Sequence, residues 1–392
     1  MRNYYSYKRV IKLIVYLVVL CLGLILLNSC TQPTEANETS YTSSEEVALL
    51  KEQAEQGDIE TQLLLAAILH RSGENSESAY WTGRAAKLGN AFAQYNLGEM
   101  YRNGLGVTQN YERAIYWFTK AVEQNYLSAQ TALGIMYNHG QGVEVNYEQA
   151  LHWYRKAADY DALAQNNLGM MYAGGQGVEQ SHEMAVYWFR RAAEQGDAMA
   201  QRNLGVQYRD GRGITQNYEQ AEYWFRKAAA QGDVIAQTNL GIMYDNGIGV
   251  AQNYEQAVYW YRKAAEQGYA RVQHFLGAMY HFGFGVAQDY EQAVYWYREA
   301  ADQGYADAQH NLAVMYMQGL GVPQSYNEAA LWTKKAAEQN EMRAQGNLGA
   351  MYHHGLGIEQ SYEQAAYWYK RAIAQGNVRA EANLATLPAQ YR

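Results

Sequence analysis

The 36 residues from Asp233 to Gly268, DVIAQTNLGIMYDNGIGVAQNYEQAVYWYRKAAEQG, contain two helical patterns joined by a turn. In the first half Ala236, Leu240 and Tyr244 recur every four residues, so they lie on one face of a helix. Asp233 precedes this pattern and is an expected N-cap, because its carboxylate can accept hydrogen bonds from the free amides of the first turn. The segment after Gly232 is therefore predicted to be a helix with one buried face.

A second helix is predicted after two glycines. Gly247 and Gly249 supply the positive-φ positions that end the first helix and turn the chain. The second helix is expected to begin at Asn253, with Gln256 three residues later as in a capping box. Its apolar residues at i, i+3, i+4 and i+7 are Ala257, Trp260, Tyr261 and Ala264, and Gly268 ends it. The unit is a helix-turn-helix.

This unit recurs along most of the chain, as the nine tryptophans show. They are Trp81, Trp117, Trp153, Trp188, Trp224, Trp260, Trp296, Trp332 and Trp368, and every step is 36 residues except the 35 between Trp153 and Trp188. That short step coincides with the turn 159–161, which lacks the usual glycine. A unit of this length cannot bury a core alone, so the period predicts a stacked array. We expect an all-α, right-handed helical-repeat solenoid of about nine repeats.

A glycine recurs inside most of the predicted first helices, directly after a leucine. The pairs are Leu97-Gly98, Leu133-Gly134, Leu168-Gly169, Leu204-Gly205, Leu240-Gly241, Leu276-Gly277 and Leu348-Gly349, with Leu312-Ala313 and Leu384-Ala385 in the two other places. Glycine within a helix costs about 1 kcal/mol relative to alanine. Its recurrence predicts that a neighbouring helix passes too close for a larger side chain, and we expect the bulky tryptophan to be that neighbour.

The combined pattern resembles the Sel1-like repeat family, which is related to tetratricopeptide repeats. It reads Ala-x-Ala-x-x-x-Leu-Gly-x-x-Tyr, then Gly-x-Gly-Val, then Tyr-x-x-Ala-x-x-Trp-Tyr/Phe-x-Lys-Ala-Ala, and it covers about residues 45–388. The loop 71–74 is about four residues shorter than its equivalents. Some members of the family carry a cysteine pair in each repeat, and this chain has none, so its repeats must hold by packing. The ends read as caps: Ser44–Gln56 as a lone second-type helix and Asn377–Leu387 as a lone first-type helix.

The N-terminus reads as an export signal. Four basic residues precede an uncharged apolar run from Leu13 to Leu27, and Cys30 follows a small residue, Ser29. The ending resembles a bacterial lipobox, which implies a signal peptide over 1–29 and lipidation of Cys30. The alternative is an uncleaved anchor from about Val10 to Leu27, near the short limit for a membrane span. Thr31 lacks the acidic residue of an inner-membrane retention signal, so the resemblance favours the outer membrane.

The rest of the chain is predicted to be a tether and one solenoid. Residues 30–44 are polar and read as a flexible tether, and 45–392 form the repeat domain. The formal net charge is −8, and it becomes −12 without the four basic residues before Cys30. So acidic a chain disfavours nucleic acid and anionic lipid surfaces as partners. The membrane is then expected to be a partner only through the N-terminal lipid.

No sequence motif for catalysis is present. The chain contains no Ser-x-x-Lys, Gly-x-Ser-x-Gly, His-Glu-x-x-His or phosphate-loop signature. The nine histidines are scattered, and the one adjacent pair, His353 and His354, points about 100° apart on a helix. We therefore expect no enzyme activity, no cofactor and no metal site. The resemblance leaves a weaker alternative, a β-lactamase-like hydrolase, because some secreted Sel1-like proteins have that activity.

The concave face of the predicted superhelix, lined by the first helices, is the expected binding surface for protein or peptide partners. An asparagine precedes the leucine in most of them, and the hypothetical contact residues are Asn96, Asn167, Asn203, Asn239, Asn311 and Asn347, with Phe275 and Phe282 as apolar anchors. Two alternatives stay open. The asparagines can instead bond the neighbouring repeat, and the phenylalanines can belong to the core.

Seven to eight residues beyond each asparagine position the sequence varies freely, and these residues are expected to select the partner. They are Asn103, His139, Asp210, Asn246, Phe282, Gln318 and His354. The function predicted from the sequence is a protein-interaction scaffold or adaptor at the bacterial cell envelope. A surface-exposed factor that contacts a host is the alternative.

Overall fold

The computed structural model describes residues 44–392, and these form 20 α-helices and one short 3-10 helix, without a strand. The first-type helices are α3 (Ile59–Arg71), α5 (Ala91–Asn103), α7 (Leu127–His139), α9 (Ala162–Gly174), α11 (Ala198–Asp210), α13 (Val234–Asn246), α15 (Ala270–Phe282), α17 (Ala306–Gln318), α19 (Met342–His354) and α21 (Val378–Leu384). The second-type helices are α2 (Ser44–Glu55), α4 (Asn75–Lys87), α6 (Tyr111–Val122), α8 (Tyr147–Ala157), α10 (His182–Glu194), α12 (Tyr218–Ala230), α14 (Tyr254–Glu266), α16 (Tyr290–Asp302), α18 (Tyr326–Glu338) and α20 (Tyr362–Ile373). The 3-10 helix η1 (Ala389–Tyr391) follows α21.

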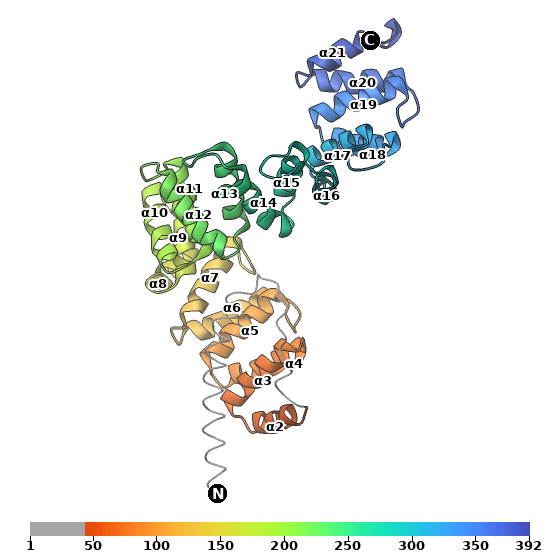
Figure 1. Ribbon diagram of the computed structural model, residues 1–392. Coiled ribbons are helices and arrows are strands. Elements are labelled where there is room, and N and C mark those ends of the chain that lie inside the picture. The colour runs from red at the N-terminus through yellow and green to blue at the C-terminus, as the bar shows by residue number, and fades with distance from the viewer. Residues whose placement is uncertain (1–43) are drawn as a thin grey trace. The chain divides into compact units, whose positions relative to one another are not determined.

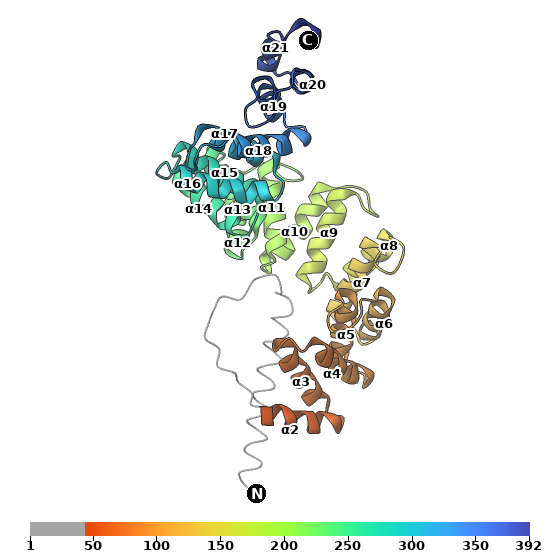
Figure 2. The same cartoon turned by 90° about the vertical axis from the view of Figure 1, so that its right-hand side faces the viewer.

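The helices pack in chain order, which confirms the predicted helical-repeat solenoid. Within each of the two units, first helices contact the second helix that follows them, as α5 contacts α6 and α15 contacts α16, and also the second helix before them, as α5 contacts α4 and α15 contacts α14 (Figures 1 and 2). In the described part of the chain, nine first helices from α3 to α19 are each followed by a second helix. The chain divides into two compact units: the first ends at Gln201 and takes in Arg212–Ile214, and the second comprises Arg202–Gly211 and Thr215–Arg392.

The predicted caps of the repeat 233–268 are confirmed. The Asp233 carboxylate accepts from the Ala236 backbone N–H at 2.7 Å, and the Asn253 side chain accepts from the Gln256 N–H at 3.0 Å. Gly247 ends α13 with φ +67°. The Asp233 and Asn253 side chains therefore cap the starts of the two helices, and the backbone of Gly247 ends the first helix.

The core of a repeat is small side chains around one large ring. In the repeat 233–268, Ala236, Leu240 and Ala257 are fully buried, and Tyr261 is 1 % exposed. Trp260 is also buried but lies nearer the surface, with its ring edge-on to exposed Tyr259. The small alanines allow close approach of the helices, so that the ring of residue 261 fills the space between them.

The neighbour of the recurring glycine is this ring, and the expectation that it would be the tryptophan is wrong. A Cβ built on Gly98 would lie 2.5 Å from Phe118 Cε1, and one on Gly134 would lie 2.5 Å from Tyr154 Cε1. The same holds for the aromatic residue after the tryptophan in the repeats of Gly169, Gly205, Gly241, Gly277 and Gly349. Successive helix residues point about 100° apart, so the residue after the tryptophan faces the glycine.

The two ends and the short step differ from a regular repeat. Helix α2 matches the helix predicted as the N-terminal cap. Helix α21 ends at Leu384, three residues earlier than expected, and the buried side chain of Leu387 packs in the core next to it. In the repeat that is one residue shorter, the backbone N–H of Asp161 donates to the carbonyl of Ala157, four residues earlier. In the longer turns the equivalent N–H donates to the carbonyl five residues earlier, as that of Asp197 does to Ala192. The missing glycine therefore tightens this turn.

The predicted signal peptide, Cys30 and nearly all of the predicted tether lie outside the described residues. Within residues 44–392 no helix has both the length and the apolar character to cross a membrane.

Candidate partner-binding surface

The asparagines singled out in the sequence all lie on first helices and are half-buried. Asn96 is on α5, Asn167 on α9, Asn203 on α11, Asn239 on α13, Asn311 on α17 and Asn347 on α19. The Asn167 side-chain nitrogen is buried without a hydrogen-bond partner. The Asn203 side-chain oxygen accepts from Arg202 Nε at 3.3 Å. Binding of a partner by this set stays a prediction.

Two of these asparagines are bonded to the preceding repeat. The Asn239 amide donates to the Ile235 carbonyl at 2.8 Å, and its oxygen accepts from Arg209 of α11 at 2.6 Å. The Asn311 amide nitrogen lies 2.9 Å from Nε2 of His274 on α15. At these two positions the side chain links first helices, which is the alternative interpretation of the asparagine pattern.

The two phenylalanines on α15 have different environments. Phe275 packs against the core, tilted on Tyr261 at 5.5 Å between ring centroids, with the Arg271 guanidinium above its ring. Phe282 is 59 % exposed and stacks on the His281 ring. Phe275 therefore belongs to the packing of the repeat, and Phe282 is available at the surface.

The variable residues share one place in the fold: each is the last residue of its first helix. They are Asn103, His139, Asp210, Asn246, Phe282, Gln318 and His354, and all except half-buried Asp210 are exposed. A glycine with positive φ follows each of them, as Gly283 (φ +74°) follows Phe282. The backbone is therefore the same in each repeat, while the side chain presented at this point differs.

A row of buried glutamines joins consecutive repeats, and the sequence analysis did not identify it. Gln309 of α17 donates to the carbonyl of Ala301 at the end of α16 at 3.1 Å, and its oxygen accepts from Gln339, just after α18, at 2.8 Å. The equivalent bonds join the glutamine pairs 94 and 124, 165 and 195, 237 and 267, 273 and 303, and 345 and 375. The signal was present in the sequence, because both glutamines recur with the 36-residue period.

Two glutamines of this row lack the partner glutamine that donates to their side-chain oxygen in the other repeats. The side-chain oxygens of Gln62 and Gln130 are buried without a partner. The place of the donating glutamine is taken by Leu88 after α4 and by Tyr160 in the shortened turn. The two unpaired oxygens therefore follow directly from two departures of the sequence from its own repeat.

At five junctions the residue after the row glutamine faces the N-cap residue of the next first helix. The observed pairs are Tyr95 with Tyr126 (5.3 Å between ring centroids), Thr131 with Asp161 (2.5 Å), Arg202 with Asp233 (3.2 Å), His274 with Tyr305 (5.4 Å between centroids) and His310 with Glu341 (3.7 Å). Each pair is chemically matched: ring with ring, hydroxyl with carboxylate, and base with acid. These contacts distinguish one repeat junction from the next.

Metal ligands do not gather in the described part of the chain: no group of three or more His, Cys, Asp or Glu side chains there could hold an ion. The surface offers hydrogen bonds, exposed rings and charges on a repeated backbone, which is what recognition of another macromolecule requires.

Comparison with known proteins agrees with the repeat. The model of the Sel1 repeat matches residues 91–126, 127–159, 162–197, 198–233, 234–269, 270–305, 306–341 and 343–377. The search of curated proteins returned no match.

Solved structures similar to this chain include relatives from bacteria. The Sel1 repeat protein from Oxalobacter formigenes is 34 % identical over 83 % of this chain and 99 % of its own, with a TM-score of 0.60. A protective antigen present in uropathogenic Escherichia coli strains, c5321, is 32 % identical over 88 % of this chain and 91 % of its own, with a TM-score of 0.49. The chain belongs to the Sel1 repeat family.

Proposed function

We propose that this protein is a scaffold or adaptor that binds protein or peptide partners along its first helices, at the bacterial cell envelope. One observation carries the proposal. In seven repeats the last residue of the first helix varies among five residue types, is exposed in six of the seven, and is followed by a glycine with positive φ. Helical-repeat proteins use such extended surfaces to bind partners, because side chains can vary there without changing the fold.

The charge of the surface supports a protein partner and disfavours a polyanion. The formal net charge of the chain is −8, so phosphate backbones are repelled at physiological ionic strength. Phe282 offers an exposed ring of the kind that anchors protein interfaces. The envelope location rests on the N-terminal sequence alone, namely the basic and apolar segments before Cys30.

Site-specific crosslinking in intact cells tests the surface. Asn246, Phe282 and Gln318 are each replaced by p-benzoylphenylalanine and irradiated in the full-length protein. We expect all three positions to capture the same partner. The matched controls are Glu255 and Glu291, which are exposed on the second helices α14 and α16. If a partner is captured only from the control positions, it binds the second helices, and the proposal is contradicted.

Membrane anchoring is tested separately with Cys30→Ala. We expect the variant to leave the membrane fraction, and to lose capture of envelope partners while keeping its folded repeats. Retention in the membrane fraction would favour the uncleaved anchor. Capture of host proteins instead of the cell's own would favour the host-contact alternative.

A further inference from the structure

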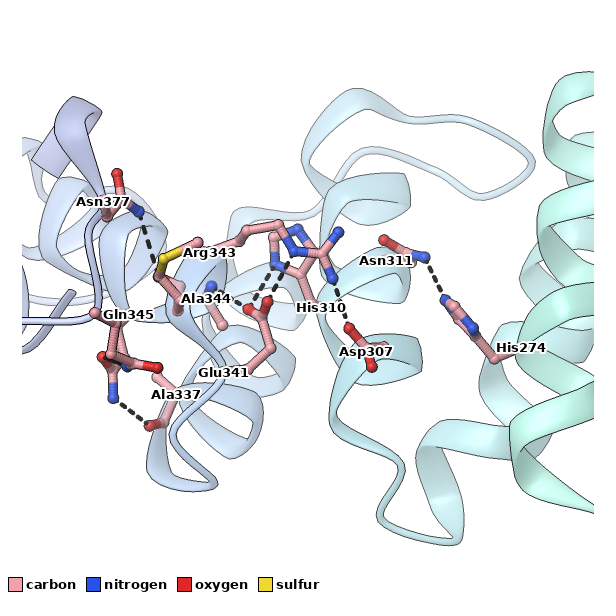
Figure 3. Close-up of polar contacts among 12 residues, drawn as sticks. His274, Asp307, His310, Asn311, Ala337, Glu341, Arg343, Ala344, Gln345 and Asn377 are labelled. Carbon is pink, nitrogen blue, oxygen red and sulfur yellow. Dashed lines mark hydrogen bonds and ion pairs between the residues drawn. The ribbon is translucent and has the colours of Figure 1, made fainter. Parts of the chain in front are cut away.

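A cluster of polar side chains lies where α15, α17 and α19 follow one another in the second unit (Figure 3). Its charged and titratable members come from four helices and their first turns. They are Arg271 and His274 of α15, Tyr297 of α16, Tyr305, Asp307 and His310 at the start of α17, and Glu341 and Arg343 at the start of α19. No other junction in the described residues combines two histidines with two carboxylates and an arginine.

Arg343 already occupies both carboxylates of the cluster. Its guanidinium lies 2.7 Å from Asp307 and 2.8 Å from the first carboxylate oxygen of Glu341. The second oxygen of Glu341 accepts from the Ala344 N–H and so caps α19. With neutral histidines, Asp307, Glu341 and Arg343 together carry one net negative charge, and Arg271 is a second cation of the cluster. Glu341 is needed for the start of a helix.

His310 is placed beside this carboxylate without a hydrogen bond to it. Its imidazole is 6 % exposed, and its Nδ1 lies 3.7 Å from Glu341 and has no hydrogen-bond partner. Burial holds the pKa of His310 below its ordinary value, although Glu341 and Asp307 act in the opposite direction. A proton on His310 would put a buried charge at the junction and draw Glu341 away from the α19 cap.

His274 is set up as a neutral acceptor. Its Nε2 lies 2.9 Å from the Asn311 amide nitrogen, so the ring nitrogen accepts from that amide, and the buried Nδ1 has no partner. Burial lowers the pKa of His274 to about 4. Protonation at Nε2 would set two donors against each other and break the bond that joins α15 to α17.

We propose that this cluster is a pH-sensitive joint, which holds α15, α17 and α19 together when both histidines are neutral and opens when they take up protons. The sign follows from linkage: the open form binds protons at the ordinary histidine pKa of about 6.5, above that of the closed form. The closed form is therefore fully favoured above about pH 6.5 and loses its advantage as the pH falls from there towards the closed-form value.

Hydrogen–deuterium exchange of the full chain tests the joint, with rates corrected for intrinsic exchange. We expect the corrected exchange rate of peptides in α17 and α19 to be higher at pH 5 than at pH 7.5. Protonation of His274 alone can raise this rate by at most about 30-fold. The variants copy other junctions of this chain, so that they fold: His274→Thr recreates the pair Thr238 and Tyr269, and His310→Thr recreates Thr131 with a carboxylate. Each variant should lose part of the pH response, and the double variant most of it.

Exposed His152 on α8, changed to Gln, is the matched control and should leave the response of α17 and α19 unchanged. An unchanged exchange rate in the wild type between the two pH values would overturn the proposal. So would an equal pH response in the wild type and the double Thr variant, because carboxylates elsewhere would then be responsible.

Discussion

Gly98 of α5 lies directly against the ring of Phe118 of α6, and a methyl group on Gly98 would be 2.5 Å from Phe118 Cε1. Three first helices lack this glycine, and the two of them that are followed by a second helix have a matching change. Ala66 and Ala313 occupy it, and the residue after the tryptophan is then Thr82 or Thr333 instead of a ring. Helix residue and ring are therefore one packing unit, in which a larger residue on one side requires a smaller one on the other.

Gly98→Ala is expected to lower the free energy of unfolding by about 1–2 kcal/mol, because the overpacking exceeds the gain in helix propensity. Phe118→Thr alone should lower it by about 3 kcal/mol by leaving a cavity. The double variant copies Ala313 and Thr333, and its loss should be smaller than the sum of the two. Urea unfolding of the four proteins measures the coupling.

Gly83 in α4 is the control for this experiment. It is also a helical glycine, but the nearest atom to an added Cβ is Leu97 Cδ2 at 3.9 Å. Gly83→Ala should therefore stabilise the protein by up to about 1 kcal/mol. If Gly83→Ala and Gly98→Ala had the same effect, ring packing would not be the reason for the recurring glycine.

Leu88→Gln is expected to raise stability. The new amide can donate to the buried, unpaired oxygen of Gln62, as Gln124 donates to Gln94 at 2.8 Å. Leu88 is 54 % exposed, so little apolar burial is lost. The gain should be about 1 kcal/mol, seen as a higher thermal midpoint and slower amide exchange in α3 and α4. Leu88→Ala, which brings no donor, should not give it, and a gain from both variants would argue against the glutamine bond.

The sequence was sufficient to predict the helices and their order along the chain, because the regular spacing of tryptophan and glycine is a local pattern. It predicted the caps Asp233 and Asn253 and both terminal helices, although α21 ends at Leu384. It did not predict which residue lies against the recurring glycine. That depends on the rotation of one helix about its axis relative to the next, and a period common to both helices carries no information on this rotation.

The candidate site was only partly predictable for a similar reason. The asparagine pattern is visible in the sequence, but the bonds of Asn239 to Arg209 and of Asn311 to His274 join residues 30 and 37 apart in neighbouring repeats. Single-repeat reasoning does not include such contacts. The glutamine row was missed although its residues recur regularly, because each bond again crosses from one repeat to the next.

Asp233 has two roles that substitution can separate. It caps α13 through Ala236 and pairs with Arg202 of α11 at 3.2 Å. Asp233→Asn keeps the cap acceptor and removes the charge, and should lower the free energy of unfolding by less than about 1 kcal/mol, because the pair lies near the surface, where solvent weakens the attraction between the charges. Asp233→Ala removes both and should lower it by about 1–2 kcal/mol more. The comparison uses urea unfolding at low and high salt, where only the ion-pair part should depend on salt; equal losses in the two variants would show that the cap contributes nothing.

Phe275 and Phe282 lie seven residues apart on α15 and should respond differently to truncation. Phe275→Ala removes a ring packed on Tyr261 and should lower the free energy of unfolding by about 2 kcal/mol. Phe282→Ala should change stability by less than about 0.5 kcal/mol, because the ring is 59 % exposed. It should nevertheless weaken capture of the partner from a neighbouring position such as Gln318. Exposed Tyr295 on α16, changed to Ala, is the control for loss of a surface ring and should leave capture unchanged. Full capture by Phe282→Ala would show that this ring is not an anchor, and a large loss of stability would place it in the core of the repeat.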